Sequence, residues 1–262
     1  MTPASSSSPL PRRAIIAVTS ATAPLHQGQP TWLFISEALD PFNVFKDAGF
    51  EVDIVSEKGT CVPNWLSLQP DFLDGEDKEQ WEDLNGEFRT KLDNMPAAAD
   101  VADVESVDGK NATTLCSLMY PSYGIFFASA GHAALIDYPH ATGLQKIATD
   151  VWNRDGVLSA VCHGEAIFPG IIDSTTGKSV IAGKTITGFT TQAEYDMNLT
   201  DPIRSWGEPL IDEWAEKLGA KYVRSEGVWD DFHVTDGRIV TGMNPQSAKS
   251  TAKAAVDIFQ KL

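Results

Sequence analysis

The sequence contains little cysteine: three residues of 262, at positions 61, 116 and 162. An odd and sparse set does not form a disulfide framework, so we expect the chain in a reducing compartment. The N-terminal stretch from Met1 to Arg13 is rich in Ser and Pro and lacks the apolar core of a secretory signal. We therefore expect a cytoplasmic protein, with the nucleus as a further location.

Basic side chains and long apolar runs are also scarce. Lys and Arg total 20 against 36 Asp and Glu, which gives a formal net charge of -16. A polyanionic surface repels nucleic acid and anionic membranes, so we expect neither as a partner. No apolar stretch reaches the length that is needed to span a membrane.

Sequence motifs for cofactors and metals are missing too. Gly28 and Gly49 are isolated, so no Gly-rich loop that would cradle a phosphate is apparent. His26, His140 and His233 show no metal-ligand spacing with Cys or Asp. We therefore expect neither a cofactor nor a metal.

Short apolar runs alternate with helical periods along the chain. The apolar runs are residues 13–19, 50–56, 125–129 and 157–161. The helical periods lie within residues 144–152, 210–218 and 252–259. Continuous apolar runs are typical of strands buried on both faces, and their alternation with helices predicts one doubly wound α/β domain with a mostly parallel sheet. The Asp-Gly pair at 236–237 predicts a hairpin.

The chain shows no internal repeat and no domain linker. We expect a disordered tail at residues 1–12 and a single domain at residues 13–262. The polar, acidic stretch at residues 63–107 is too long for a simple connection, so we expect it to form a helical cap over the sheet.

Cys162 stands where an apolar run ends abruptly and His163 and Gly164 follow. A buried strand that turns sharply into a helix presents its turn residue as a nucleophile in α/β proteins. We expect the Cys162 side chain to be exposed there, with the helix N-terminus and His163 favouring the thiolate. The alternative is a buried structural cysteine at a strand end.

Glu37 lies in an otherwise apolar segment that should reach the same edge of the sheet. Ligands of open parallel sheets bind beyond the carboxyl ends of the strands, where residues 36–42, 130–132 and 162–164 should converge. A carboxyl group in apolar surroundings tends to keep its proton, and a protonated Glu37 facing a thiol would shuttle protons. The alternative is a surface Glu on a helix.

Other polar residues of these segments have weaker signals. Glu194 follows a strand and a loop of small residues, and it would orient His163 as the third member of a triad. Gly131 would let backbone N–H groups approach a developing oxyanion. His132 is either a pocket-lining residue or a structural histidine.

Several motifs together resemble the PfpI-type superfamily of class I glutamine-amidotransferase-like folds. Within it, the chain is similar to the fungal branch of stress-induced chaperones and glutathione-independent glyoxalases (glyoxalase III). The motifs cover nearly the whole chain after the tail, at residues 37–42, 126–132, 137–139, 160–164, 186–190, 229–231, 235–238 and 241–245.

The resemblance implies a flavodoxin-like three-layer sandwich with a small cap, assembled as a homodimer. It also implies conversion of a small aldehyde, methylglyoxal, to lactate without glutathione or metal. Cys162 would form a hemithioacetal, Glu37 or His163 would move the proton through an enediol, and Glu194 would hold His163. Gly131, His132, Gly164 and Trp32 would then surround the substrate or its oxyanion.

The chain departs from the family pattern at three places. Glu165 stands where the family usually has Pro, and its charge would oppose thiolate formation if it pointed at Cys162. Trp32 lies where a Gly is usual, so it would shrink the pocket or offer a stacking surface. Residues 108–121 resemble an insertion, which would form a lid, a dimer contact or a passive loop.

These departures leave two further functions open. A diverged paralogue would act as a lyase, hydratase or isomerase on a larger electrophile in a secondary-metabolite pathway. A holdase chaperone would bind clients through an exposed apolar patch. The glyoxalase and the pathway enzyme both need Cys162, whereas holdase action would survive Cys162→Ser.

Overall fold

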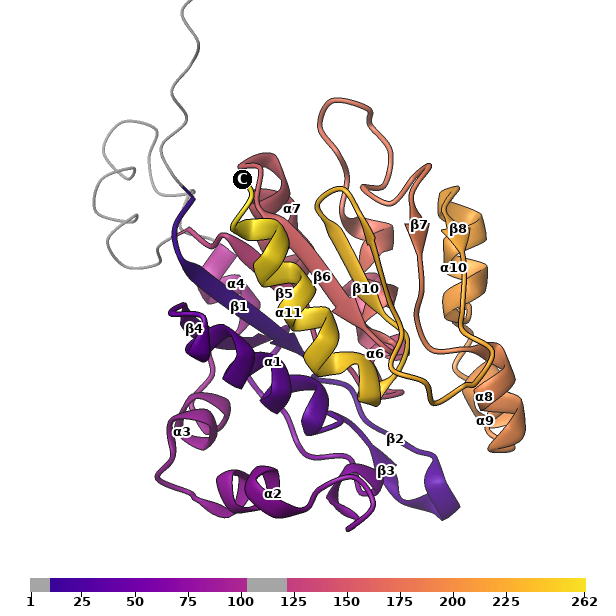
Figure 1. Cartoon of the computed structure of the whole chain (residues 1–262). Coiled ribbons are helices and arrows are strands. Elements are labelled where there is room, and N and C mark those ends of the chain that lie inside the picture. Colours follow the sequence, from indigo (N-terminus) through magenta and orange to yellow (C-terminus); the bar gives the residue numbers. More distant parts are fainter. Residues whose placement is uncertain (1–9, 103–121) are drawn as a thin grey trace, which may run out of the picture.

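The computed structural model describes residues 10–102 and 122–262 and contains a central six-stranded sheet with the order β4-β1-β5-β6-β10-β9 (Figure 1). In chain order its strands are β1 (Arg13–Val18), β4 (Glu51–Ser56), β5 (Ile125–Ala128), β6 (Val157–Val161), β9 (His233–Asp236) and β10 (Ile239–Gly242). β9 pairs antiparallel with β10, and the other pairings are parallel. The predicted α/β fold with a mostly parallel sheet is confirmed.

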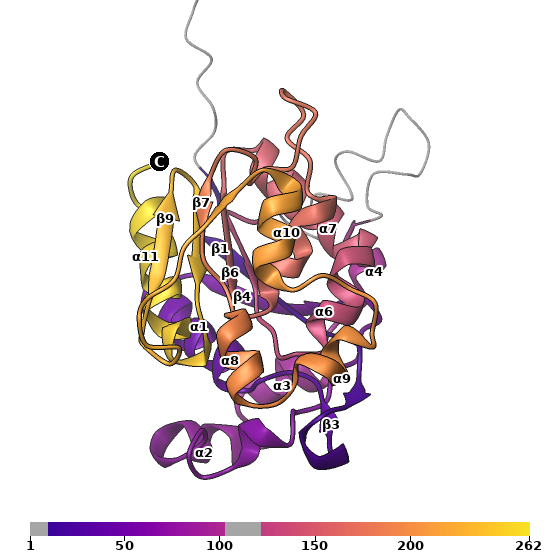
Figure 2. The same cartoon turned by 90° about the vertical axis from the view of Figure 1, so that its right-hand side faces the viewer.

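Helices cover both faces of this sheet. On one face α1 (Ser36–Asp47) packs against α11 (Ala248–Phe259), and on the other α7 (Thr142–Asn153) packs with α4 (Ala98–Ala102) (Figure 2). The other α-helices are α2 (Gly75–Glu82), α3 (Glu87–Asp93), α6 (Ala134–Asp137), α8 (Thr191–Asp196), α9 (Thr200–Arg204) and α10 (Ile211–Leu218). The 3-10 helices are η1 (His26–Gly28), η2 (Leu66–Leu68), η4 (Tyr138–His140), η5 (Gly164–Gly170) and η6 (Pro245–Ser247). Two small sheets contain β2 (Ala23–Pro24) with β3 (Pro30–Thr31) and β7 (Thr185–Ile186) with β8 (Lys221–Tyr222).

The apolar pattern of the chain explains the layers. Every residue of β5 and β6 is buried, as expected for strands with helices on both faces. α7 buries Leu144, Ile147, Ala148 and Val151 at helical spacing and leaves its polar face outside. The hairpin between β9 and β10 turns through Gly237, whose φ of 66° favours glycine.

Some of the expected features differ in form or lie outside the described residues. The described part of the stretch at residues 63–107, which ends at residue 102, contains η2, α2, α3 and α4, and α3 packs against β4. The helix expected after Cys162 is the short 3-10 helix η5, so the expectation of a regular helix there is wrong. Residues 1–9 of the tail and the whole insertion at 108–121 lie outside the described part of the chain.

Among the helices of residues 10–102 and 122–262, none combines the length and the apolar character that a membrane crossing needs.

Candidate active site

Cys162 occupies a strained turn between β6 and η5. Its φ of 65° lies in the left-handed region, which is uncommon for a residue other than glycine. The turn is held by the Cys162 N–H, which donates to Gly242 O at 2.9 Å, and by the Phe189 N–H, which donates to Cys162 O at 2.7 Å. A Cβ at Gly164 would lie 2.3 Å from Ala128 O, so the chain can follow this path only with glycine there.

The expectations of an exposed and easily ionised Cys162 are both wrong. The residue is 3% exposed. Burial raises the pKa of its thiol well above the usual value, and the nearby Glu37, Glu165 and Glu194 add to the rise. The seven residues of η5 do not offset three acidic neighbours. The resting side chain is therefore a neutral thiol, which would need a base in order to act as a nucleophile.

His163 and Glu194 supply such a base. Cys162 Sγ lies 3.2 Å from His163 Nδ1, and His163 Nε2 lies 2.7 Å from Glu194 Oε1. Because a carboxylate only accepts hydrogen bonds, Nε2 carries the ring proton and Nδ1 can accept the proton of the thiol. Burial, helped by His132, lowers the pKa of His163 to about 4, so the ring is neutral at neutral pH.

Glu194 is held in place by the first turn of α8. The side chain of Thr190 caps this helix by accepting a hydrogen bond from Ala193 N at 3.0 Å. Burial alone would raise the pKa of Glu194, but His132 and His163 outweigh it and lower the pKa to about 2. Glu194 is therefore ionised, as the orienting member of a triad should be.

Glu37 is the second residue of α1, and its carboxyl group is completely buried. Its Oε2 accepts a hydrogen bond from Ala130 N at 3.1 Å. Burial raises the pKa of Glu37 to about 8, although Cys162 and the Ala130 amide oppose the rise. The surface alternative is therefore wrong, and the site contains a carboxylic acid that stays protonated at neutral pH beside the thiol.

Gly131 lies against the backbone of Trp32, and His132 follows it toward Glu194. Gly131 has a φ of 152°, and a Cβ there would lie 1.9 Å from Trp32 O, so only glycine allows this close approach. His132 Nε2 lies 3.2 Å from Glu194 Oε2, and its ring centroid is 4.4 Å from that of His163. One carboxylate thus faces both imidazoles, a pairing that the sequence analysis did not predict.

Sequence reasoning also missed some neighbours of the site. The ring of Phe189 lies 4.6 Å from that of His163, and the ring of His26 lies 5.3 Å from that of His132. Glu165 was noticed only as a departure from the family pattern, yet it is 2% exposed and both of its carboxyl oxygens lack a hydrogen-bond partner among the described residues. These residues come from separate segments with no fixed spacing, so no sequence motif could have joined them.

The same cluster also has the composition of a metal site. One ligand atom from each of His132, His163 and Glu194 lies within 4.8 Å of the others, and all three residues are buried. No metal was predicted from the sequence, because His132, His163 and Glu194 are far apart along the chain and form no metal-binding motif. The fold brings these three together from different loops.

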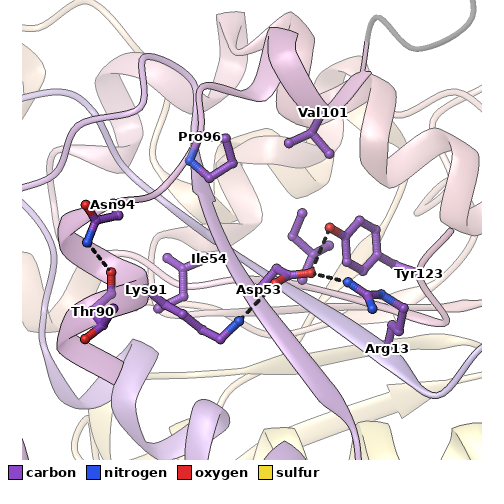
Figure 3. Close-up of a pocket in the computed structure, with 10 residues that line it drawn as sticks. Arg13, Asp53, Ile54, Thr90, Lys91, Asn94, Pro96, Val101 and Tyr123 are labelled. Atoms are coloured by element: carbon purple, nitrogen blue, oxygen red, sulfur yellow. Dashed lines mark hydrogen bonds and ion pairs between the residues drawn. The ribbon is translucent and has the colours of Figure 1, made fainter. Parts of the chain in front are cut away.

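A second hollow lies at the opposite edge of the sheet, near the amino ends of β1 and β5. It has a volume of about 390 Å³ (Figure 3). Inside it Asp53 accepts hydrogen bonds from Arg13 at 2.7 Å, Lys91 at 3.1 Å and Tyr123 at 3.1 Å. These charged and polar groups of the hollow therefore pair with one another.

The chain is similar over nearly its whole length to curated fungal proteins. It is 44% identical to "Glyoxalase 3" of Candida albicans over 249 residues, which is 95% of this chain and 98% of that protein. It is 41% identical to "Glutathione-independent glyoxalase HSP31" of Saccharomyces cerevisiae over 251 residues, which is 95% of this chain and 99% of that protein. No protein-family profile matches the chain.

Solved structures show the same relationship. The crystal structure of glyoxalase III from Candida albicans superposes with a TM-score of 0.85 at 45% identity, covering 95% of this chain and 98% of that one. A ThiJ/PfpI domain protein from Brachyspira murdochii, at 12% identity and a TM-score of 0.53 with 97% of this chain and 99% of that one covered, shares the fold alone. Identity above 40% over almost complete chains leaves no doubt about kinship: the chain belongs to the family of glutathione-independent glyoxalases.

Proposed function

We propose that this protein is a glutathione-independent glyoxalase that converts methylglyoxal and related 2-oxoaldehydes to 2-hydroxy acids through Cys162. One observation carries the proposal: a thiol, a protonated carboxylic acid and a His–Glu pair meet at one buried point. Relatives that align over nearly the whole chain are named glutathione-independent glyoxalases. A homodimer, which the resemblance implies, remains part of this proposal.

The first step joins the substrate to sulfur. Cys162 Sγ attacks the aldehyde carbon while His163 Nδ1, 3.2 Å away, takes the thiol proton. The carbonyl electron pair moves to oxygen, which receives the proton of Glu37. A neutral hemithioacetal results, with an imidazolium at His163 and a carboxylate at Glu37. Glu194 stabilises the imidazolium across the 2.7 Å hydrogen bond.

The next steps move hydrogen between the two carbons. The Glu37 carboxylate removes the proton from the sulfur-bearing carbon, and the ketone oxygen takes the proton from His163, which gives an enediol. Glu37 then protonates the second carbon while His163 takes the proton of the first hydroxyl, which leaves a thioester. Water breaks the carbon–sulfur bond, releases the 2-hydroxy acid and restores the thiol, and His163 returns the remaining proton to Glu37.

The protonation states in the resting site suit this sequence. The first step needs an acid to protonate the new oxyanion and a neutral imidazole to accept the thiol proton. A Glu37 with a pKa of about 8 and a His163 with a pKa of about 4 are both in the required form at neutral pH. We include Gly131 and Gly164 as positions whose backbone N–H groups would donate to the reacting oxygen, as the resemblance to the family implies.

We expect the wild-type protein to form lactate from methylglyoxal without glutathione, and Glu37→Gln to lower kcat by roughly 10²-fold or more. The amide keeps the size of the side chain and its place beside Ala130, but it neither donates an acidic proton nor accepts one from carbon. Lactate is to be quantified enzymatically. Glu208→Gln, which changes an exposed ion pair with His140, is the matched control and should keep full activity.

Two results would argue against the proposal. Wild type that forms no lactate above buffer would favour the larger electrophile of a pathway enzyme or the holdase. Full activity in Glu37→Gln would leave His163 as the group that moves the carbon-bound proton.

A further inference from the structure

Three imidazoles and one carboxylate converge beside Cys162 from four separate segments of the chain. His26 lies in η1, His132 follows β5, His163 follows β6, and Glu194 lies in α8. The ring of His132 lies between its neighbours, 5.3 Å from that of His26 and 4.4 Å from that of His163. Imidazole and carboxylate are the ligands that zinc binds in proteins.

The ligand atoms already approach the spacing of a zinc site. Two ligands of a tetrahedral zinc, each at about 2.0–2.1 Å, lie about 3.3 Å apart. Here Glu194 Oε2 is 3.2 Å from His132 Nε2, and Glu194 Oε1 is 2.7 Å from His163 Nε2. Because the three side chains can bring their ligand atoms within 4.8 Å of one another, small rotations suffice to close the set around an ion.

His26 supplies an independent observation. Its Nε2 atom is buried and has no hydrogen-bond partner among the described residues, which is a costly state for a ring nitrogen. A cation held by His132, His163 and Glu194 would lie near the His26 ring, whose centroid is 5.3 Å from that of His132, and a rotation of that ring would give its nitrogen a partner.

We propose that His132, His163 and Glu194, with His26 as a fourth ligand, form an inhibitory site for a zinc-like divalent cation. Binding through His163 Nε2 moves the ring proton to Nδ1, which faces Cys162 Sγ at 3.2 Å. That nitrogen then donates a hydrogen bond and no longer accepts the thiol proton, so the first catalytic step stops. The inhibition rests on the proposed glyoxalase function, whereas the binding does not.

The binding test uses the full-length protein after removal of metals with a chelator. Calorimetric titration with Zn²⁺ and the visible absorption of added Co²⁺ should each report one tightly bound ion per chain. His132→Ala removes one of the three central ligands and should weaken Zn²⁺ binding on the order of a hundredfold. His26→Ala removes only the fourth ligand and should weaken Zn²⁺ binding about tenfold. Circular dichroism checks that each variant is folded, and His26→Ala serves the test if His132→Ala does not fold.

Two control variants make the assignment specific. His140 is exposed and forms its own pair with Glu208 at 2.7 Å, so His140→Ala should leave Zn²⁺ affinity unchanged. Cys162→Ser should also bind as wild type does, because the thiol is not among the ligands. Affinity lost in Cys162→Ser, or kept in both His132→Ala and His26→Ala, would overturn the proposal.

The inhibition test measures lactate formation in the same metal-free protein. One equivalent of Zn²⁺ should reduce turnover at least tenfold, and excess chelator should restore it. Turnover that is unaffected by stoichiometric Zn²⁺, while calorimetry shows the ion bound, would refute the inhibitory role. A wild type without turnover would contradict the glyoxalase function, and calorimetry would still decide the metal site.

Discussion

Cys162→Ser is expected to reduce lactate formation from methylglyoxal on the order of 10³-fold or more. A serine hydroxyl is a weaker nucleophile than a thiol and holds its proton more tightly. The site makes this difference larger, because three acidic side chains near position 162 oppose any negative charge there. His163 would have to remove a proton from an alcohol in surroundings that already disfavour ionisation of a thiol. Initial rates at saturating methylglyoxal measure the loss.

Cys61→Ser is the matched control for this experiment. Cys61 is the other free cysteine of the described residues, and its Sγ donates to Val62 O at 3.7 Å, whereas the Sγ of Cys162 contacts His163. The control should keep full activity and the melting temperature of wild type. A Cys162→Ser protein that is folded and still forms lactate at the wild-type rate would refute a covalent mechanism at this residue.

Glu165→Gln is expected to make the protein more stable, by an amount that grows with pH. Burial raises the pKa of Glu165 well above its model-peptide value of 4.5, and the nearby Glu37 adds to the rise. The unfolded chain therefore loses its proton at a lower pH than the folded chain. Below the unfolded pKa both states are protonated and the stability that Glu165 contributes is fully present. As the pH rises above the unfolded pKa, this stability is progressively lost, and the loss stops growing once the pH passes the folded pKa.

The size of this effect follows from proton linkage. The free-energy gap between Glu165→Gln and wild type should widen with rising pH above the unfolded pKa, by at most about 1.4 kcal/mol per pH unit. Urea denaturation of both proteins at a series of pH values measures the gap. Glu216→Gln, on the exposed face of α10, should show no such trend. A constant gap across the series would mean that Glu165 ionises as freely in the folded state as in the unfolded one.

The Glu165→Gln variant should still lose stability as the pH rises. The other buried acid, Glu37, has a pKa of about 8 and follows the same sign. In Glu165→Gln the unfolding free energy should therefore still fall as the pH rises toward 8. Both carboxyl groups destabilise the fold at neutral pH, which is a common feature of functional sites.

Much of the architecture could be predicted from local patterns. The four apolar runs correspond to β1, β4, β5 and β6. A strand that helices cover on both faces is apolar at nearly every position, so it is visible in the sequence as a continuous run. The turn at Cys162 was predictable from the abrupt end of one run before His-Gly. The protonated state of Glu37 was also predictable, since its sequence neighbours are apolar and remain beside it in a helix.

The chemical state of the thiol depends on groups that are distant in the sequence. Local reasoning predicted an exposed, acidic Cys162 from the expected helix N-terminus and the neighbouring His163. The folded chain instead surrounds the sulfur with carboxyl groups from α1, η5 and α8, and long-range charge and burial outweigh the few dipoles of a short 3-10 helix.

Sequence patterns, then, specify backbone elements, because hydrogen bonding and apolar spacing act between near neighbours. They also placed Cys162, the proposed nucleophile, at the end of a strand. The meeting of His26, His132, His163 and Glu194 has no counterpart in the sequence, since their segments lie beside one another only when the strands align in the sheet. Electrostatic energies depend on distance through space, so the protonation of the site and its capacity for a metal arise only in the folded molecule.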